Sequence, residues 1–399
     1  MPRTIDVIII LCLYFAAYAS LALESLNAAA LYFALPVAFL LSLVKNRDVG
    51  INKFLNKYEV VLLLLFAWVF LSSLWAQYEA SASRELHRCL GSILLSFIFA
   101  ANATDKKMRP WLYLTYLVLY MGAWNYAQNN IVIDVTGAYG SDRDRMNDAK
   151  LNANTMAYYT FFVSFVIFIL GEWLENDFWR KICKIAFFML FPLSFVVALV
   201  TASRQVLIIQ VPLLTFMLYY RYWQNMSGLY RAISIIVIVA VFVALSGFVE
   251  SVYSNSYLAV RSEKNLNDDS RFLLLEDAAA VAIDHFPLGV GAGNYIEYSY
   301  NRHFSHSSYF ELFANQGIVG LFLFVYLIGL FVKNQWNRFM ITQNRNYLLF
   351  FVFGLIFLID NIFYVFYLDM WLIGFFILVA THSLAYSQEH YGSCLFKES

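Results

Sequence analysis

The stretch HFSHSSYFELFANQGIVGLFLFVYLIGLFV (residues 303–332) passes from a polar beginning into an apolar run, 308–332, in which Glu311 is the only charged residue. A helix of this length and composition crosses the hydrocarbon core of a bilayer, which is ~30 Å thick. Comparable apolar runs fill much of the chain, at 5–23, 28–44, 58–76, 89–104, 110–127, 153–172, 185–201, 205–220, 232–249, 346–366 and 370–386. The pattern predicts an all-α integral membrane protein with about twelve transmembrane helices.

Composition supports the same class. The 399 residues are 61% hydrophobic and only 14% charged, whereas a soluble domain is about 25% charged. We therefore expect a single polytopic membrane domain over residues 1–399, whose first span is retained rather than cleaved as a signal peptide. The net charge of zero argues against nucleic acid as a partner. The four cysteines show neither a disulfide framework nor a metal-ligand spacing.

Lysine and arginine in the short loops predict the orientation, because cytoplasmic loops carry an excess of both. With the N-terminus inside, 17 of the 27 Lys and Arg residues fall in inner segments. Both termini are then cytoplasmic. The two longest hydrophilic stretches, 128–152 and 250–307, become periplasmic loops, and we expect the larger one to carry the catalytic residues.

The ten outer cations are unevenly divided between the two residue types. Two are lysines, and eight are arginines: Arg84, Arg88, Arg143, Arg145, Arg204, Arg261, Arg271 and Arg302. A guanidinium group binds phosphate through two parallel hydrogen bonds, which an ammonium group cannot do. The excess favours an outward-facing site for a phosphorylated or pyrophosphorylated ligand. The alternative is that these arginines pair with acids in the same loops, such as Glu297.

The helix that follows His306 has a recognisable beginning. Ser308 and Glu311 have the S-x-x-E spacing of a capping box, with Ser308 as the N-cap. His306 then lies near the positive end of the helix dipole, which favours a neutral imidazole able to accept a proton. Gly317 and Gly320 place small residues on one side of the helix, where another helix can approach closely. The alternative for His306 is an interfacial histidine that only forms hydrogen bonds to its loop.

Other polar residues have weaker signals. Arg204 begins a span and either binds a ligand or extends its charge to the interface. Asp360 interrupts the run 346–366 near its outer end, and an intramembrane acid is a functional candidate, although an arginine could pair with it. The motif GVGAGN (residues 289–294) follows no strand, so we interpret it as a tight turn whose backbone amides approach an anion rather than as a nucleotide loop. No H-x-x-x-H or similar spacing indicates a metal site.

Four segments together resemble the bacterial O-antigen ligase family. HSSYFELFANQGIVG (306–320) is similar to its His-[Asn/Ser/Gln]-x9-Gly-x-x-Gly pattern at the end of the large periplasmic loop. TASRQVL (201–207) looks like its arginine at the start of a mid-chain span. SRFLLLEDAAAVAIDHFPLGVGAGNY (270–295) is similar to its arginine-containing helix and Pro-x-Gly-x-Gly turn, and RDRMNDAKLNANTMA (143–157) looks like the segment leading to its Asn-containing helix.

The resemblance implies a GT-C-like fold and a metal-independent inverting glycosyltransferase in the bacterial inner membrane. The implied donor is a glycan on undecaprenyl pyrophosphate, and the implied acceptor is a hydroxyl of lipid A–core. The protein would be in contact with membrane lipids and would use neither a nucleotide nor another cofactor. Two alternatives stay open: a Wzy-type polymerase of glycan repeat units and a transporter of the lipid-linked glycan. The predicted roles are catalytic for His306; pyrophosphate-binding for Arg204, Arg271, Arg145 and Arg302; and supporting for Ser307, Glu311, Asn154, Gly291, Gly293 and Asp360.

Overall fold

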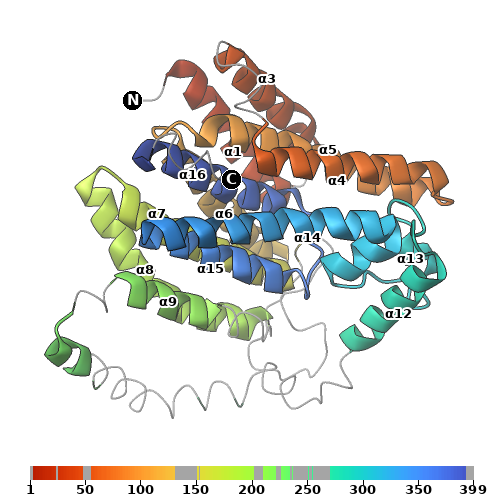
Figure 1. The fold of residues 1–399 in the computed structure, drawn as a ribbon. Helices are drawn as coiled ribbons and strands as arrows, with labels where there is room; N and C mark the ends of the chain where they lie inside the picture. The colour runs from red at the N-terminus through yellow and green to blue at the C-terminus, as the bar shows by residue number, and fades with distance from the viewer. Residues whose placement is uncertain are drawn as a thin grey trace. The chain divides into compact units, whose positions relative to one another are not determined.

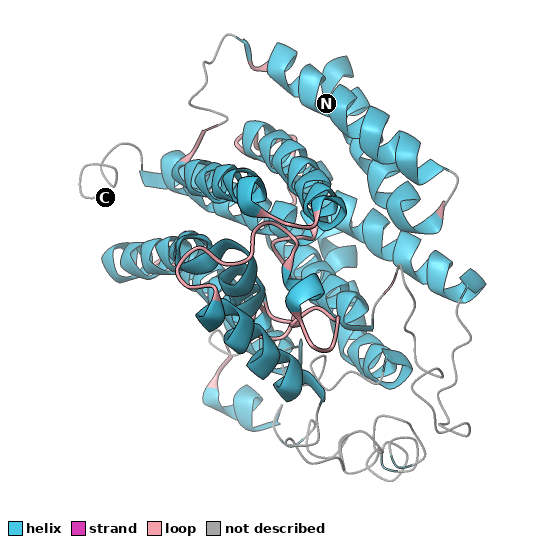
Figure 2. Ribbon diagram, turned by 90° about the vertical axis from the view of Figure 1, so that its right-hand side faces the viewer, coloured by secondary structure: helices cyan, strands magenta, loops and turns pink. Residues whose placement is uncertain are grey.

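A computed structural model describes residues 3–23, 26–47, 55–130, 151, 153–201, 210–221, 226–233, 236, 250, 254 and 270–391. These residues form helices joined by short loops, and none of them belongs to a β-strand (Figure 2). The chain divides into two compact units, each made of segments that are distant in sequence. The first comprises Met1–Ala16, Ala28–Tyr113 and Leu266–Ser399, and the second comprises Ala17–Asn27 and Leu114–Asn265.

The helices of the first unit contain the candidate site. They are α2 (Asn27–Ala29), the π-helix η2 (Ala30–Ala34), α3 (Leu35–Lys45), α4 (Lys57–Ser72), the 3-10 turn η5 (Ser73–Trp75), α5 (Glu79–Ala103), α12 (Ser270–Asp284), α13 (Tyr295–Tyr298), α14 (Ser308–Thr342), α15 (Arg345–Asp360) and α16 (Met370–Tyr391). The helix α1 (Thr4–Ala22) begins in this unit. Figure 1 shows α12 and α13 beside the beginning of α14, in agreement with their contacts.

The second unit contains α7 (Ala153–Trp173), α8 (Asp177–Thr201) and α9 (Val211–Arg221), and most of α6 (Arg109–Asn130) belongs to it. The helices α7 and α8 pack closely against each other through buried aromatic side chains. Phe168 and Phe187 meet in a T-shaped, edge-to-face arrangement with ring centroids 5.7 Å apart. Such pairs add stability beyond the apolar area they bury.

Seven helices are long and apolar enough to cross a membrane within the described residues. They cover Thr4–Ala22, Asn27–Lys45, Lys57–Trp75, Glu79–Ala103, Asp177–Thr201, Ser308–Thr342 and Met370–His390. The prediction of an all-helical, multi-span protein is therefore confirmed. The count of about twelve stays a prediction, since the expected span at 232–249 lies largely outside the described part of the chain.

The C-terminal helix α16 is buried along nearly its whole length. Its sequence is apolar on every side, as expected for a helix surrounded by others. It packs against α4, α5 and α15, and Phe376 stacks on Phe357 of α15 with centroids 4.8 Å apart. The helix α14, which carries the residues discussed below, packs in turn against α4 and α15.

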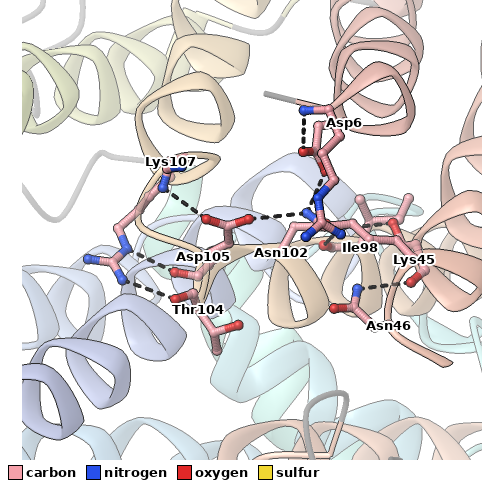
Figure 3. Close-up of polar contacts among 12 residues, drawn as sticks. Asp6, Lys45, Asn46, Ile98, Asn102, Thr104, Asp105 and Lys107 are labelled. Carbon is pink, nitrogen blue, oxygen red and sulfur yellow. Dashed lines mark hydrogen bonds and ion pairs between the residues drawn. The ribbon is translucent and has the colours of Figure 1, made fainter. Parts of the chain in front are cut away.

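A polar cluster joins α1, α3 and the end of α5 (Figure 3). The ammonium group of Lys45 lies 2.6 Å from the carboxylate of Asp6 and 3.5 Å from that of Asp105. The same group donates a hydrogen bond to Oδ1 of Asn102, whose amide donates in turn to the hydroxyl of Ser42 at 2.8 Å. Lys45 and Asp6 are both nearly inaccessible to solvent. The cluster therefore pairs charges that the surrounding helices remove from water.

Candidate active site

The long helix α14 is interrupted at Gly317. This residue has φ 66° and ψ −161°, a conformation that is essentially restricted to glycine. A Cβ atom there would lie 2.0 Å from the carbonyl oxygen of Pro287. The interruption divides α14 into a short outer part, which begins at Ser308, and a longer part after Gly317.

The break frees backbone carbonyl groups that a continuous helix would use. The turn of residues 289–293, here called the glycine turn, satisfies two of them: the N–H groups of Val290 and Gly291 donate to the carbonyls of Ala314 and Asn315, at 2.9 and 2.8 Å. The indole of Trp68 donates to the carbonyl of Gln316 at 2.8 Å. Buried backbone groups are nearly always paired, so the break and the glycine turn depend on each other.

The approach of the glycine-turn amides to an anion of the substrate stays a prediction, and the N–H of Gly293 already lies against the buried carboxyl group of Glu85. The N–H of Gly289 donates to the carbonyl of His285, and that of Gly291 is used by Asn315. The glycines also allow close packing: a Cβ atom on Gly291 would lie 2.7 Å from the backbone of Ala76, and one on Gly293 would lie 2.4 Å from the carbonyl of Ser81. Gly317 likewise allows a backbone break, rather than the helix contact predicted for it.

Helix α14 begins one residue earlier than the capping box predicted. Ser307 is the N-cap by its extended backbone, and its carbonyl accepts the first helical hydrogen bond, from the N–H of Glu311. Glu311 does not reach back to Ser308. Its Oε2 atom accepts hydrogen bonds from the N–H and the hydroxyl of Ser305, at 2.8 and 2.7 Å. The carboxylate thus fixes the turn before the helix instead of closing a capping box.

His306 lies inside that turn, residues 302–307, which we call the histidine turn. Its φ angle is 57°, a left-handed conformation that costs a residue with a side chain about 1–3 kcal/mol and persists only where neighbouring contacts impose it. Those contacts come from both sides, because Ser305 and Ser307 are buried and exchange hydrogen bonds with each other. His306 itself is half-buried. Its conformation is therefore imposed by the histidine turn.

The beginning of α14 is attached to the segment after α15. The hydroxyl of Ser308 donates to Oδ1 of Asn361 and accepts from the N–H of Phe366, while the hydroxyl of Ser307 donates to the carbonyl of Asn361. Asp360, the preceding residue, is fully buried, and neither of its carboxyl oxygens has a hydrogen-bond partner within the described residues. The pairing of Asp360 with an arginine, considered as the alternative, is therefore not seen among the described residues.

Helix α5 contributes a second buried acid. Oε1 of Glu85 accepts hydrogen bonds from the amide of Gln316, at 2.7 Å, and from the hydroxyl of Tyr367, at 3.1 Å. Glu85 and Glu311 line one pocket, together with Ser81, Arg84, Arg88, Gly293, Ile296, Phe304 and Leu368. Phe304 of the histidine turn and Glu311 of the first turn of α14 thus form part of the wall of this pocket. Asn294 follows the pocket residue Gly293 and connects it to α5. Its side-chain amide accepts a hydrogen bond from the N–H of Tyr78, the residue before α5, and donates one to the carbonyl of Tyr78.

The electrostatics of the pocket combine two arginines with several acids. Arg84 and Arg88 are exposed and form no ion pair with any described residue. Just before α16, burial raises the pKa of Asp369 to about 6, although the N–H groups of Leu372 and Trp371 and the charge of Arg88 favour its ionised form. The positive charge of Arg88 is therefore felt by Asp369, which follows the pocket residue Leu368.

Among the predicted pyrophosphate ligands, Arg302 is placed most clearly. Its side chain is 71% exposed and lies 3.3 Å from the carboxylate of Glu297, so the loop pairing considered as the alternative is present. Arg204 and Arg145 lie outside the described residues. Arg271 and Asn154 are described only as positions, near the beginning of α12 and α7 respectively. Their predicted roles stay predictions.

Glu85, Gln316 and Asn315 were not predicted from the sequence as residues of this site. Asn315 holds the break in α14 together by accepting a hydrogen bond from the N–H of Tyr295 through its side chain, at 2.7 Å. Two signals were present: the acid between two arginines in RELHR (84–88), and the amides in ANQG (314–317) inside an apolar run. The roles of Glu85 and Gln316 depend on a contact between residues 231 positions apart.

Comparison with known protein families supports a relation for the second half of this site. The family model described as O-antigen ligase matches residues 185–325, a range that contains Arg204, Arg271, the glycine turn, His306 and Gly317. No curated protein matches the chain. The matched range thus covers the part of the site on α12 and α14, whereas the α5 wall of the pocket lies before it.

Proposed function

We propose that this chain, which carries a domain of the O-antigen ligase family over residues 185–325, transfers a glycan from undecaprenyl pyrophosphate to a hydroxyl group of lipid A–core. The reaction takes place on the periplasmic face of the bacterial inner membrane. The observation that carries the proposal is the histidine turn, which holds His306 at the beginning of a transmembrane helix and beside a pocket lined by arginines. A residue in a costly conformation, fixed by its neighbours, is typical of an active site.

His306 acts as the general base in this proposal. Its imidazole accepts the proton of the acceptor hydroxyl while that oxygen attacks the anomeric carbon of the donor sugar. The bond between this carbon and the pyrophosphate oxygen breaks, and undecaprenyl pyrophosphate leaves with the electron pair. Attack from the opposite face inverts the anomeric configuration. Positioned proton transfer of this kind contributes roughly 10²–10⁴ in rate.

Arginine side chains stabilise the negative charge that develops on the leaving pyrophosphate. Arg204 and Arg271 have this role in the proposal, assisted by Arg145 and Arg302. Fixed positive groups aimed at developing charge provide a large part of enzymatic rate enhancement, and the guanidinium group fits a pyrophosphate better than lysine does. The energy for the transfer resides in the donor, so the site needs no nucleotide.

The test uses purified protein, a polyprenyl-pyrophosphate-linked glycan and two acceptors in separate reactions, with chelator present and nucleotide absent. We expect a product on lipid A–core with the wild type and none with His306→Ala. The matched control is His303→Ala, since His303 is exposed and lies in the same turn. It should transfer at the wild-type rate. Equal transfer by His306→Ala and the wild type would remove His306 from the mechanism.

The second acceptor distinguishes the remaining functions. Lengthening of the lipid-linked glycan, without product on lipid A–core, would identify a repeat-unit polymerase. The absence of any covalent product from either acceptor, together with movement of the lipid-linked glycan across a bilayer, would identify a transporter. Both outcomes contradict the proposed ligase. They differ from each other in whether a covalent product forms.

A further inference from the structure

We propose that Arg84 and Arg88 bind the diphosphate group of a lipid-linked donor and form a binding element on α5 in addition to the loop arginines. The identity of the ligand rests on the proposed function. The evidence for the binding element is independent of it and consists of the position, exposure and contacts of the two side chains.

The two arginines are one helical turn apart, so both side chains project from the same side of α5. Both line the pocket to which Phe304 of the histidine turn and Glu311 of α14 also contribute. Their α5 segment is fixed relative to the glycine turn, because Ser81 donates a hydrogen bond to Glu297 at 2.9 Å and Asn294 binds the backbone of Tyr78. The pocket therefore presents two guanidinium groups on the wall that faces the turn of His306.

The acids of the pocket do not occupy these guanidinium groups. Oε2 of Glu311 is used by Ser305, and Oε1 of Glu85 is used by Gln316 and Tyr367. Both acids are buried, whereas Arg84 and Arg88 are exposed and form no ion pair with described residues. The N–H groups of the two arginines are thus available to an external anion.

The chemistry of the pair selects a diphosphate over a single phosphate. Two guanidinium groups present parallel N–H donors, each matched to two oxygens of one phosphate. A diphosphate brings two such groups in sequence, and a lipid anchor places them at the height of the outer end of a transmembrane helix. A free pyrophosphate shares this chemistry but lacks the anchor, and a phospholipid headgroup has one phosphate only.

The experiment measures binding of fluorescent farnesyl diphosphate to the full-length protein in nanodiscs of phosphatidylcholine. Unlabelled inorganic pyrophosphate and phosphatidylglycerol compete in separate arms. We expect Arg84→Gln and Arg88→Gln each to weaken binding by about tenfold to a hundredfold, the range for a lost hydrogen-bonded charge. Arg84→Lys should recover only part of the affinity. Pyrophosphate should compete weakly, and phosphatidylglycerol should not compete.

The matched control is Arg345→Gln, an exposed arginine at the beginning of α15 that does not line the pocket. It should bind with wild-type affinity. Wild-type affinity in the Arg84→Gln/Arg88→Gln double variant would overturn the inference. Strong competition by phosphatidylglycerol would overturn the assignment to a diphosphate.

A structural role gives a different pattern. If the arginines only neutralise Glu85 and Glu311, then Arg88→Gln lowers the thermal unfolding midpoint and Glu85→Gln restores it, with no selective loss of diphosphate binding; this result would overturn the inference. Glycan transfer is measured in parallel. Loss of binding in the arginine variants, with no transfer by the wild type, supports the binding element and contradicts the proposed function. Normal transfer and normal binding in the double variant would support the proposed function and contradict the binding element.

Discussion

The carboxylate of Glu311 accepts two hydrogen bonds from Ser305, one from its N–H at 2.8 Å and one from its hydroxyl at 2.7 Å. Ser305 immediately precedes His306, whose φ angle of 57° is unfavourable for a residue with a side chain. Glu311 belongs to the first turn of α14. The helix that enters the membrane therefore also sets the backbone of the histidine before it.

We expect Glu311→Ala to slow glycan transfer strongly even though His306 is retained. The variant leaves the buried N–H of Ser305 without its acceptor, which costs about 1–3 kcal/mol, and a displacement of about 1 Å in a catalytic group can reduce a rate about 100-fold. Glu311→Gln keeps one acceptor oxygen and should be milder. Transfer rates of the two variants, measured beside the exposed control Glu276→Ala, provide the test. Equal rates for Glu311→Ala and Glu276→Ala would separate Glu311 from the histidine turn.

Gly317→Ala should destabilise the protein far more than Gly329→Ala on the same helix. At Gly317 an added Cβ meets the carbonyl of Pro287 at 2.0 Å with φ at 66°, whereas at Gly329 nothing lies within 4 Å. Backbone strain and overpacking together cost about 2–6 kcal/mol at the first position, while alanine at the second improves helix propensity by up to about 1 kcal/mol. Unfolding titrations in mixed micelles measure both. Similar effects of the two substitutions would show that the break in α14 tolerates a side chain.

The sequence predicted those parts of the fold that depend on local composition. The run 58–76 corresponds to α4 with η5, and the run 370–386 falls inside α16, because length and hydropathy alone identify a membrane helix. The run 308–332 predicted a helix but not its break, since hydropathy carries no information about the backbone of Gly317. The structure explains why the break falls at a glycine: the carbonyl of Pro287 occupies the space that a side chain at residue 317 would need.

The site was predictable to the extent that its residues are close in sequence. His306, Ser307 and Glu311 occupy one segment and were predicted as candidates, although Glu311 binds Ser305 rather than capping Ser308. Glu85 was not identified, because its partner Gln316 lies 231 positions away. A single sequence gives no signal for such a pair, and only the packing of α5 against the later helices brings it together.

Asn294→Asp should lower stability, although the two side chains have the same shape. Asn294 is fully buried, accepts the N–H of Tyr78 at 2.8 Å, and donates to the carbonyls of Tyr78 and Ala292 at 3.2 and 2.8 Å. Aspartate retains the acceptor but loses both donations and brings a buried charge, at a cost of about 1–3 kcal/mol or more. The thermal unfolding midpoint measures the effect. Asn176→Asp, at an exposed helix N-terminus, is the control and should be nearly neutral.

Lys45→Met should be among the most destabilising single substitutions in the first unit, because it leaves the buried carboxylate of Asp6 without its partner (Figure 3). Breaking a buried ion pair on one side costs about 3–5 kcal/mol, whereas replacing both charges is often nearly neutral. The double variant Lys45→Met/Asp6→Asn should therefore be more stable than Lys45→Met alone. A double-mutant cycle on the free energy of unfolding measures the coupling, with the exposed Lys107→Met as control. If the second substitution adds to the damage instead of relieving it, Asp6 is stabilised by other groups and Lys45 acts mainly through Asn102 and Asp105.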